Sequence, residues 1–314
     1  MALAIPKISY IGKIKEIELR GKDKVITVGG ETSYPFHVFE GEMPNKPVIA
    51  VEVYDSRPEE WPEAAIEPFR DVVDDPVAWA KKCIEVYGAE LVALQLASID
   101  PNAQDRPADE AVEVVKNVAE AVDVPLIVWG CANVEKDIEV LRKVAEVCSG
   151  RNLIIGPVQE GNYKQLGAVA IAYNHTVIAS TPIDINLAKQ LNVLLGNLGV
   201  PDKQILIDPT TGGLGYGLEY TYSVMERVRM AALTQEDERL QFPMICNMAK
   251  EVWKAKEVRI SEEDDPKLGD PGKRGILMET ITAVALLLAG ADILIMRHPE
   301  AINATRGMIE DLLK

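Results

Sequence analysis

The chain has 314 residues, of which 47% are apolar, and its formal net charge is −16 at pH 7. The apolar content suffices for a sizeable core in one large domain or two ordinary ones. The negative charge excludes a nucleic-acid-binding surface, which needs a basic stripe. Residues 1–20 lack the continuous apolar stretch of a signal peptide, and the apolar run 281–291 is too short to span a bilayer. We therefore expect a soluble, cytoplasmic protein without a membrane segment.

Residues 1–46 form the first predicted unit, an N-terminal extension. Two strand-like stretches, 13–19 and 25–28, flank the turn-forming tripeptide Gly21-Lys22-Asp23. This pattern predicts an antiparallel β-hairpin. The residues alone leave two roles open, because the hairpin either closes one end of the following domain or meets a partner.

From Pro47 onward, short apolar runs alternate with helical patterns, which indicates a parallel α/β sheet. The runs are nearly all apolar rather than alternating, as expected of strands that are covered on both faces. The eight predicted strands are Val48–Val53, Leu91–Leu96, Leu126–Trp129, Leu153–Pro157, Thr176–Ala179, Ile205–Asp208, Met244–Asn247 and Ile293–Arg297.

The segments between these runs begin and end like helices. Asp75-Pro76, Asn133 and Thr181-Pro182-Ile183-Asp184 are helix-start signals, and a last helix is predicted from about Pro299 to Leu313. Eight βα units over residues 47–314 fit a (β/α)₈ TIM barrel better than a doubly wound sheet. The segment 248–275, after the seventh strand, is long and charged, and long loops in compact domains are often functional.

The sixth predicted strand leads into an unusual run, QILIDPTTGGLGYGLEYTYS (204–223), with glycines at 212, 213, 215 and 217. Glycine costs backbone entropy, so this density needs a local reason. One interpretation is a tight strand-to-helix turn in which Asp208 caps the helix that includes Ser223 to Leu233. The other is a loop that exposes its backbone to a broad ligand with many polar edges. The residues leave both interpretations open.

In a TIM barrel, ligands bind at the carboxyl ends of the strands. The polar candidates at these ends are Asp100, Asn102, Asp208 and Asn247, which we expect on one rim because all strands run parallel. The sequence contains no convincing nucleophile triad and no metal-ligand spacing, so we assign neither catalytic nor metal-binding residues. His298 is expected to cap the last helix rather than act as a base. The four cysteines, Cys83, Cys131, Cys148 and Cys246, are expected to be small buried residues.

Three stretches together resemble one known family. They are DPTTGGLGYGLEYTYSVMER (208–227), PMICNMAKEVWKAKE (243–257) and VIAVEVYD (48–55). They resemble the small subunit of the corrinoid iron–sulfur protein, the delta-subunit family of the acetyl-CoA decarbonylase/synthase complex. The similarity covers the whole chain, including the N-terminal hairpin, and its implied fold is again a (β/α)₈ barrel.

The resemblance implies a heterodimer with a larger corrinoid iron–sulfur subunit that carries a [4Fe–4S] cluster and a cobamide-binding domain. The cobamide is then shared between that domain and the mouth of this barrel. The complex passes a methyl group from a methyltetrahydrofolate-type methyltransferase to acetyl-CoA synthase/CO dehydrogenase in the acetyl-CoA (Wood–Ljungdahl) pathway. The expected cobamide-binding residues are Asp100, Asn102, Asp208, Thr210, Thr211, Gly212, Gly213, Gly215 and Asn247.

The absence of the D-x-H-x-x-G pattern agrees with a cobalt that takes no imidazole from this chain. Two other functions stay open. One is a stand-alone methyltransferase whose TIM barrel binds a methyltetrahydropterin through Asp100, Asn102, Asp208 and Asn247. The other is a scaffold whose mouth only docks a neighbouring protein.

Overall fold

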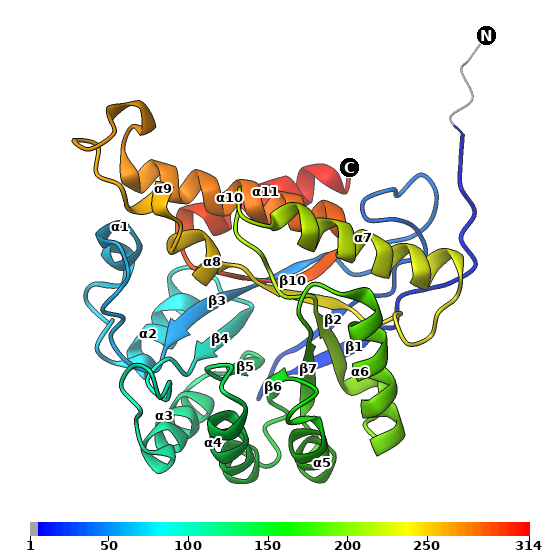
Figure 1. The fold of residues 1–314 in the computed structure, drawn as a ribbon, viewed down its shortest axis with the longest axis horizontal. Coiled ribbons are helices and arrows are strands. Elements are labelled where there is room, and N and C mark those ends of the chain that lie inside the picture. The colour runs from blue at the N-terminus through cyan, green and yellow to red at the C-terminus, as the bar shows by residue number, and fades with distance from the viewer. Residues whose placement is uncertain (1–5) are drawn as a thin grey trace.

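A computed structural model describes residues 6–314 and shows eight parallel strands closed into a barrel in the order β10-β3-β4-β5-β6-β7-β8-β9 (Figure 1). The predicted fold class is therefore confirmed, and every predicted strand lies within two residues of its observed bounds. The barrel strands are β3 (Val48–Tyr54), β4 (Leu91–Gln95), β5 (Leu126–Trp129), β6 (Ile154–Val158), β7 (Thr176–Ser180), β8 (Ile205–Asp208), β9 (Met244–Asn247) and β10 (Ala291–Met296).

Helices surround the barrel, and the predicted start signals act as caps. Asp75 accepts hydrogen bonds at the start of α2, and Asn133 and Asp184 do the same for α4 and α6. The His298 ring accepts from the Glu300 amide at 3.2 Å, which confirms its predicted capping of α11. The helices are α1 (Glu63–Ile66), α2 (Pro76–Glu85), α3 (Ala108–Ala121), α4 (Val134–Val147), α5 (Tyr163–Tyr173), α6 (Ile185–Leu198), α7 (Leu218–Thr234), α8 (Ala249–Trp253), α9 (Lys256–Arg259), α10 (Pro271–Ala289) and α11 (Pro299–Leu312). Within residues 6–314, no helix combines the length and apolar character needed to cross a bilayer.

The N-terminal hairpin closes the floor of the barrel. Strands β1 (Ile17–Arg20) and β2 (Val25–Val28) pair antiparallel, with Ile17 opposite Val28. Ile17, Leu19 and Val28 belong to the same buried cluster as the inward-facing residues of the barrel strands. The predicted hairpin is confirmed, and of its two open roles the structure shows floor closure. Because hairpin and barrel share this core, the division at residue 46 stays a prediction.

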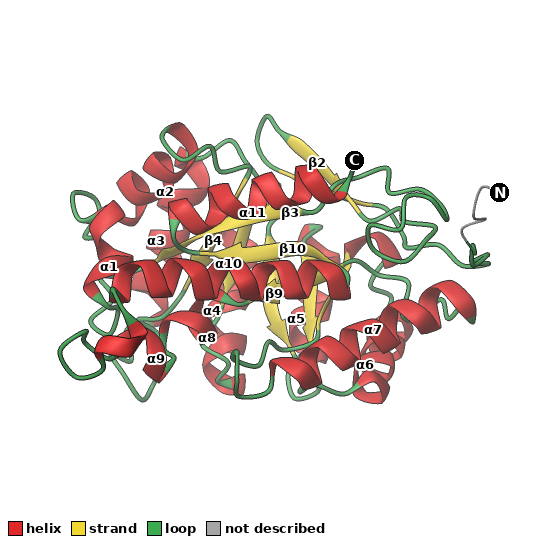
Figure 2. Cartoon of the chain, turned by 90° about the horizontal axis from the view of Figure 1, so that it is seen from above, coloured by secondary structure: helices red, strands yellow, loops and turns green. Residues whose placement is uncertain are grey.

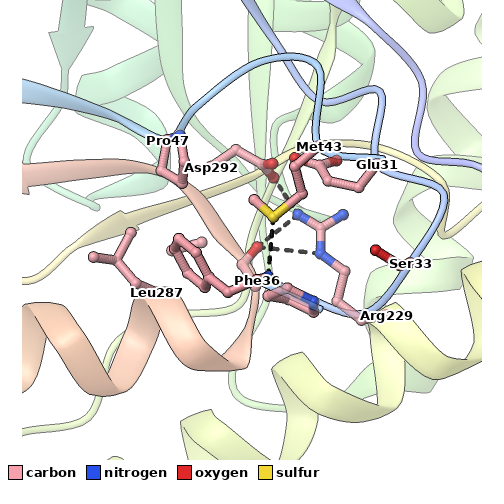
Figure 3. A pocket seen from close by; sticks show the side chains of 11 residues that line it. Glu31, Ser33, Phe36, Met43, Pro47, Arg229, Leu287 and Asp292 are labelled. Carbon is pink, nitrogen blue, oxygen red and sulfur yellow. Dashed lines mark hydrogen bonds and ion pairs between the residues drawn. The ribbon is translucent and has the colours of Figure 1, made fainter. Parts of the chain in front are cut away.

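A buried ion pair lies beside the segment that follows the hairpin. Arg229 of α7 pairs with Asp292 of β10 and donates two hydrogen bonds to the Gly290 carbonyl, at 3.1 and 2.6 Å. Figure 3 shows the guanidinium beside Asp292 and Glu31, which comes from the N-terminal segment. Burial and the nearby Asp292 carboxylate raise the pKa of Glu31 well above its usual range. The N-terminal region thus covers the lower end of the barrel with the hairpin and again with the segment around Glu31.

The floor closure predicts a stability effect. We expect Leu19→Ala to lower the free energy of unfolding by about 2–5 kcal/mol, because the side chain is fully buried in the barrel core. Arg20→Ala is the control, since its exposed side chain lies on the other face of the same strand and should change stability by less than about 0.5 kcal/mol. Urea unfolding measures both values. Equal stability of the two variants would contradict floor closure.

Candidate ligand-binding site at the barrel mouth

The inner wall of the barrel changes from apolar to polar at the carboxyl ends of the strands. Gln95, Asp208 and Asn247 lie two residues beyond the buried core residues Ala93, Leu206 and Ile245. Because alternate residues of a strand share a face, these polar side chains continue the inward-facing rows. The Asn247 amide donates to Gln95 Oε1 at 3.5 Å, a contact between strands that are not neighbours in the barrel. The mouth is therefore lined by polar groups on a sealed apolar base.

One half of this polar layer is filled by the protein itself. Arg297, directly after β10, forms a buried ion pair with Glu52 of β3, with Nε and Oε2 2.7 Å apart. The guanidinium carbon also lies 3.6 Å from the centroid of the Trp61 ring. Glu279 of α10 accepts from the Arg297 amide at 2.5 Å and from Trp253 Nε1 at 2.9 Å. Burial raises the pKa of Glu279 to about 7.

The other half is open. It forms a cavity of about 220 Å³ lined by Gln95, Trp129, Gly130, Cys131, Ala132, Pro157, Gln159, Ser180, Asp208, Thr210, Thr211, Asn247, Lys250 and Glu251. Within residues 6–314, the buried Asn247 Oδ1 has no hydrogen-bond partner. An unpartnered buried acceptor costs free energy, which a ligand in the cavity would recover by donating a hydrogen bond to this atom.

Asp208 is the buried carboxylate of this cavity. It accepts from Ser180 Oγ at 2.8 Å and from the Thr210 amide at 3.0 Å. Burial raises its pKa to about 6 in spite of these hydrogen bonds. Thr210 has a φ of 60°, which is unfavourable for a β-branched residue, and its hydroxyl donates to the Thr181 carbonyl at 2.8 Å. Asp208 and Thr181 together hold this strained residue at the rim.

The turn geometry of the β8–α7 loop requires most of its glycines. Gly215 and Gly217 have positive φ angles of 73° and 130°, and a Cβ on Gly212 would lie 2.8 Å from the Gly217 backbone. Gly213 differs, because a Cβ there would meet only the Glu251 carbonyl at 3.8 Å and the Tyr216 side chain at 4.0 Å. The tight-turn interpretation thus accounts for three glycines and leaves Gly213 without an internal reason. The second part of that interpretation, in which Asp208 caps the following helix, is wrong. Asp208 accepts hydrogen bonds from Ser180 and Thr210, and α7 begins at Leu218, beyond its reach as a cap.

The predicted site residues divide into three groups. Asp208, Thr210, Thr211 and Asn247 line the cavity, while Gly212, Gly213 and Gly215 follow along the loop toward α7. Asp100 and Asn102 follow β4 on the same rim but lie outside the cavity lining, where Asp100 Oδ1 accepts from the Asn102 amide at 2.8 Å in a local turn.

Sequence reasoning missed two of the lining residues that face inward, Gln95 and Trp129, and also Glu52 in the filled half. Their signal was available, because each lies two residues beyond an apolar inward-facing position.

The cysteines follow their predicted role with one qualification. Cys83, Cys148 and Cys246 are buried, whereas Cys131 is half-buried and lines the cavity. Burial, helped by the Asp137 carboxylate, raises the pKa of Cys131 to about 12, so this thiol is neutral at pH 7. Cys131 is therefore a half-buried, uncharged group of the cavity lining.

The closed eight-stranded parallel barrel with helices between its strands, and with a polar mouth at the carboxyl ends, makes this chain a (β/α)₈ TIM-barrel protein. Solved structures of the same fold include dihydropteroate synthases. The enzyme from Vibrio fischeri matches with a TM-score of 0.60 at 13% identity, covering 95% of this chain and 98% of that one. The enzyme from Xanthomonas albilineans matches with a TM-score of 0.58 at 14% identity and the same coverage.

Sequence comparison identifies the family. The family model of the CO dehydrogenase/acetyl-CoA synthase delta subunit matches residues 11–307, so the chain belongs to this family. The acetyl-CoA decarbonylase/synthase complex subunit delta of Archaeoglobus fulgidus is 38% identical over 98% of this chain and 70% of its own length. The subunit of the same name from Methanopyrus kandleri is 37% identical over 92% of this chain and 71% of its own length. The resemblance stated from the sequence is confirmed.

The raised pKa of Asp208 predicts a pH-dependent stability difference between the wild type and Asp208→Asn. The folded state holds the Asp208 proton up to about pH 6, whereas an unfolded chain releases it near the ordinary aspartate pKa of 3.8. Burial of this group therefore costs stability as the pH rises through this window, by up to about 3 kcal/mol above it. Asparagine does not titrate, so the variant should gain stability relative to the wild type between about pH 4 and 7. Urea unfolding at several pH values measures this gain, and a pH-independent difference would contradict it.

Proposed function

We propose that the chain is the small subunit of a heterodimeric corrinoid iron–sulfur methyl carrier, in which the barrel mouth covers a cobamide. The observation that carries the proposal is the open half of the mouth, where Asn247 Oδ1 is buried and unpartnered within residues 6–314. Membership of the delta-subunit family supports it. The bound cobalt would accept a methyl group from a methyltetrahydropterin methyltransferase and release it to acetyl-CoA synthase.

The residues of the mouth suit the amide-bearing rim of a corrin. Asn247 offers an acceptor, and Gly213 leaves room for close approach to the loop backbone, whose Thr210 and Gly212 amides are engaged by Asp208 and Thr221. A cavity of about 220 Å³ is too small for the whole macrocycle but has room for one of its amide side chains. In this proposal the ring lies across the rim and one side chain enters the cavity, so this chain positions and shields the cofactor.

We place the cobalt chemistry and the [4Fe–4S] cluster on the larger subunit. The histidines of this chain are already engaged in its own structure: His37 bonds Glu40 at 3.0 Å, His175 bonds the Leu153 amide and the Ala145 carbonyl, and His298 caps α11. The larger subunit is then the lasting partner, while the methyltransferase and acetyl-CoA synthase/CO dehydrogenase bind transiently. The chain supplies no catalytic residue by itself.

The proposal predicts what the purified chain contains. Expressed alone, it should be colourless, iron-free and unable to demethylate a methyltetrahydropterin. Co-expressed with the larger subunit, it should form a heterodimer with about one cobamide. Metal analysis and absorbance spectra measure both states. Tight cobamide binding by the isolated chain would contradict the sharing of the cofactor.

The role of the mouth is tested by Asn247→Leu, which removes the acceptor while keeping the side-chain shape. We expect the variant heterodimer to form. After dialysis it should hold about a tenth of the cobamide of the wild-type heterodimer, or less, because one buried hydrogen bond is lost. Asn197→Leu on the exposed face of α6 is the matched control and should retain the wild-type cobalt content. Equal cobalt content in the two variants would remove Asn247 from the site.

The size of the cavity favours a second candidate function, a TIM-barrel methyltransferase that binds a methyltetrahydropterin by itself. A bicyclic heterocycle fits a cavity of about 220 Å³, and its N–H groups would meet Asp208 and Asn247. Of the four residues expected to bind a pterin, these two lie in the cavity lining, whereas Asp100 and Asn102 do not.

Calorimetric titration of the isolated chain with methyltetrahydrofolate and methyltetrahydromethanopterin separates the two functions. The shared-cofactor proposal predicts no saturable binding at millimolar pterin. Saturable binding that Asp208→Asn weakens at least about tenfold, through loss of a charge-assisted hydrogen bond, would establish the second function instead.

A further inference from the structure

A small cavity of about 10 Å³ lies at the lower end of the barrel, where the N-terminal segment 29–47 meets the ion pair of Arg229 with Asp292 (Figure 3). Three buried polar atoms of its lining residues have no hydrogen-bond partner in the part of the chain that the structure describes. They are Glu31 Oε2, Ser33 Oγ and Arg229 Nη1. Their residues are 5%, 1% and 2% exposed, so bulk solvent does not hydrate these atoms.

The Arg229 guanidinium is engaged on one side only. Its Nε and Nη2 atoms donate to the Gly290 carbonyl, and Nη2 also pairs with Asp292. Nη1 is left over, and Figure 3 shows Glu31 and Ser33 beside the guanidinium. A buried polar atom without a partner costs the free energy of its lost hydration. Because three such atoms line one cavity, a single occupant that serves them together would recover most of this cost.

The size and charge of the cavity limit the occupant to one neutral molecule. A space of about 10–15 Å³ holds one water and nothing larger. A cation would lie against the Arg229 guanidinium, and an anion would lie against Glu31 and Asp292, the other ionisable lining residues. The raised pKa of Glu31 leaves Arg229 and Asp292 as the charged pair, and their charges cancel.

Water also has the hydrogen-bonding capacity that the cavity requires. Arg229 Nη1 can only donate, so the occupant must accept, whereas the Glu31 carboxyl and the Ser33 hydroxyl can take either role. Water accepts and donates at once, and buried waters typically make about three hydrogen bonds to groups that lack other partners. The remaining wall is largely apolar, with Phe36 and Leu287 among its residues, and offers no competing polar side chain.

The site joins separate parts of the chain at the end of the barrel away from the mouth. Figure 2 shows α10 running along β10 from the side of α1 and α9 to the opposite end, where Leu287 and Gly290 line the cavity. Segment 29–47, which leads from the hairpin to β3, carries two of the three polar atoms, and α7 carries the third. The same segment has one direct attachment to α7, because Tyr34 Oη donates to Glu226 at 3.0 Å.

We propose that this cavity is a binding site for one ordered water, which accepts a hydrogen bond from Arg229 Nη1 and is shared with Ser33 Oγ and Glu31 Oε2. The water fastens segment 29–47 to α7 and, through the ion pair, to β10. The inference is independent of the proposed function, because the site lies at the closed end of the barrel and no residue of the mouth takes part in it.

A high-resolution crystal structure of the full chain tests the site directly. We expect one water peak about 2.7–3.2 Å from Arg229 Nη1 and from at least one of Ser33 Oγ and Glu31 Oε2. A map that shows other buried waters but no density at this position would overturn the proposal. Side chains that bond one another directly across the cavity would overturn it as well.

The Glu31→Leu variant tests the fastening in solution, because the direction of its effect depends on the water. Leucine fills a similar volume but offers the water no hydrogen bond. If the water is bound, the bridge is lost, and the hydrogen-bonded Gly30 and Thr32 amides should exchange with solvent at least about tenfold faster. If the site binds no water, the variant only removes an unpartnered carboxyl, so exchange should stay the same or slow down. That second result would overturn the proposal.

Two further variants serve as controls. Glu31→Gln keeps a polar group for the water and should exchange at the wild-type rate. Glu42→Leu makes the same chemical change at an exposed position of the same segment and should also leave exchange unchanged. Mass spectrometry measures exchange in peptides from residues 29–47, and circular dichroism shows that each variant is folded. If Glu31→Gln accelerates exchange as much as Glu31→Leu, the carboxylate itself holds the segment, and the proposal is wrong.

Discussion

The buried ion pair between Arg297 and Glu52 decides the shape of the mouth. It joins the end of the last barrel strand to the first, and it fills the space above β3 and β10 with charged and aromatic groups. A buried pair costs desolvation free energy that only good geometry and further contacts offset. Here Trp61 stacks on the guanidinium, and Glu279 fixes the Arg297 backbone. The pair therefore closes this side of the mouth, and the cavity of the mouth lies on the other side.

The β8–α7 loop combines two requirements that the amino-acid pattern does not separate. Its turn needs Gly212, Gly215 and Gly217, and its strained Thr210 is held by the buried Asp208. Gly213 alone has neither a positive φ nor a close neighbour that would exclude a side chain, although its carbonyl accepts from the Tyr216 and Leu218 amides. Strain concentrated next to an unpartnered acceptor is common where a loop is shaped for a ligand. The loop therefore has a structural role along most of its length and room for a ligand at one position.

The strands and the barrel could be predicted from sequence because continuous apolar runs alternated with capped helices, and caps such as Asp75 and His298 act locally. The site was harder to predict. Asp208 and Asn247 were found because they end strands, but Gln95 was hidden inside a buried run. Asp100 and Asn102 satisfied the same rule and yet form a local turn. Whether a polar residue at a strand end points into the barrel depends on the register and on side-chain pairing, which sequence position alone does not specify.

The hairpin at the floor gives the barrel a single entrance. Ile17, Leu19 and Val28 seal the lower end, and apolar side chains fill the layers above them. Nothing can pass through the barrel, so whatever delivers a group to the mouth and whatever removes it must use the same rim in turn. Under the proposed function, the methyl donor and the methyl acceptor would therefore both reach the cofactor from this one rim.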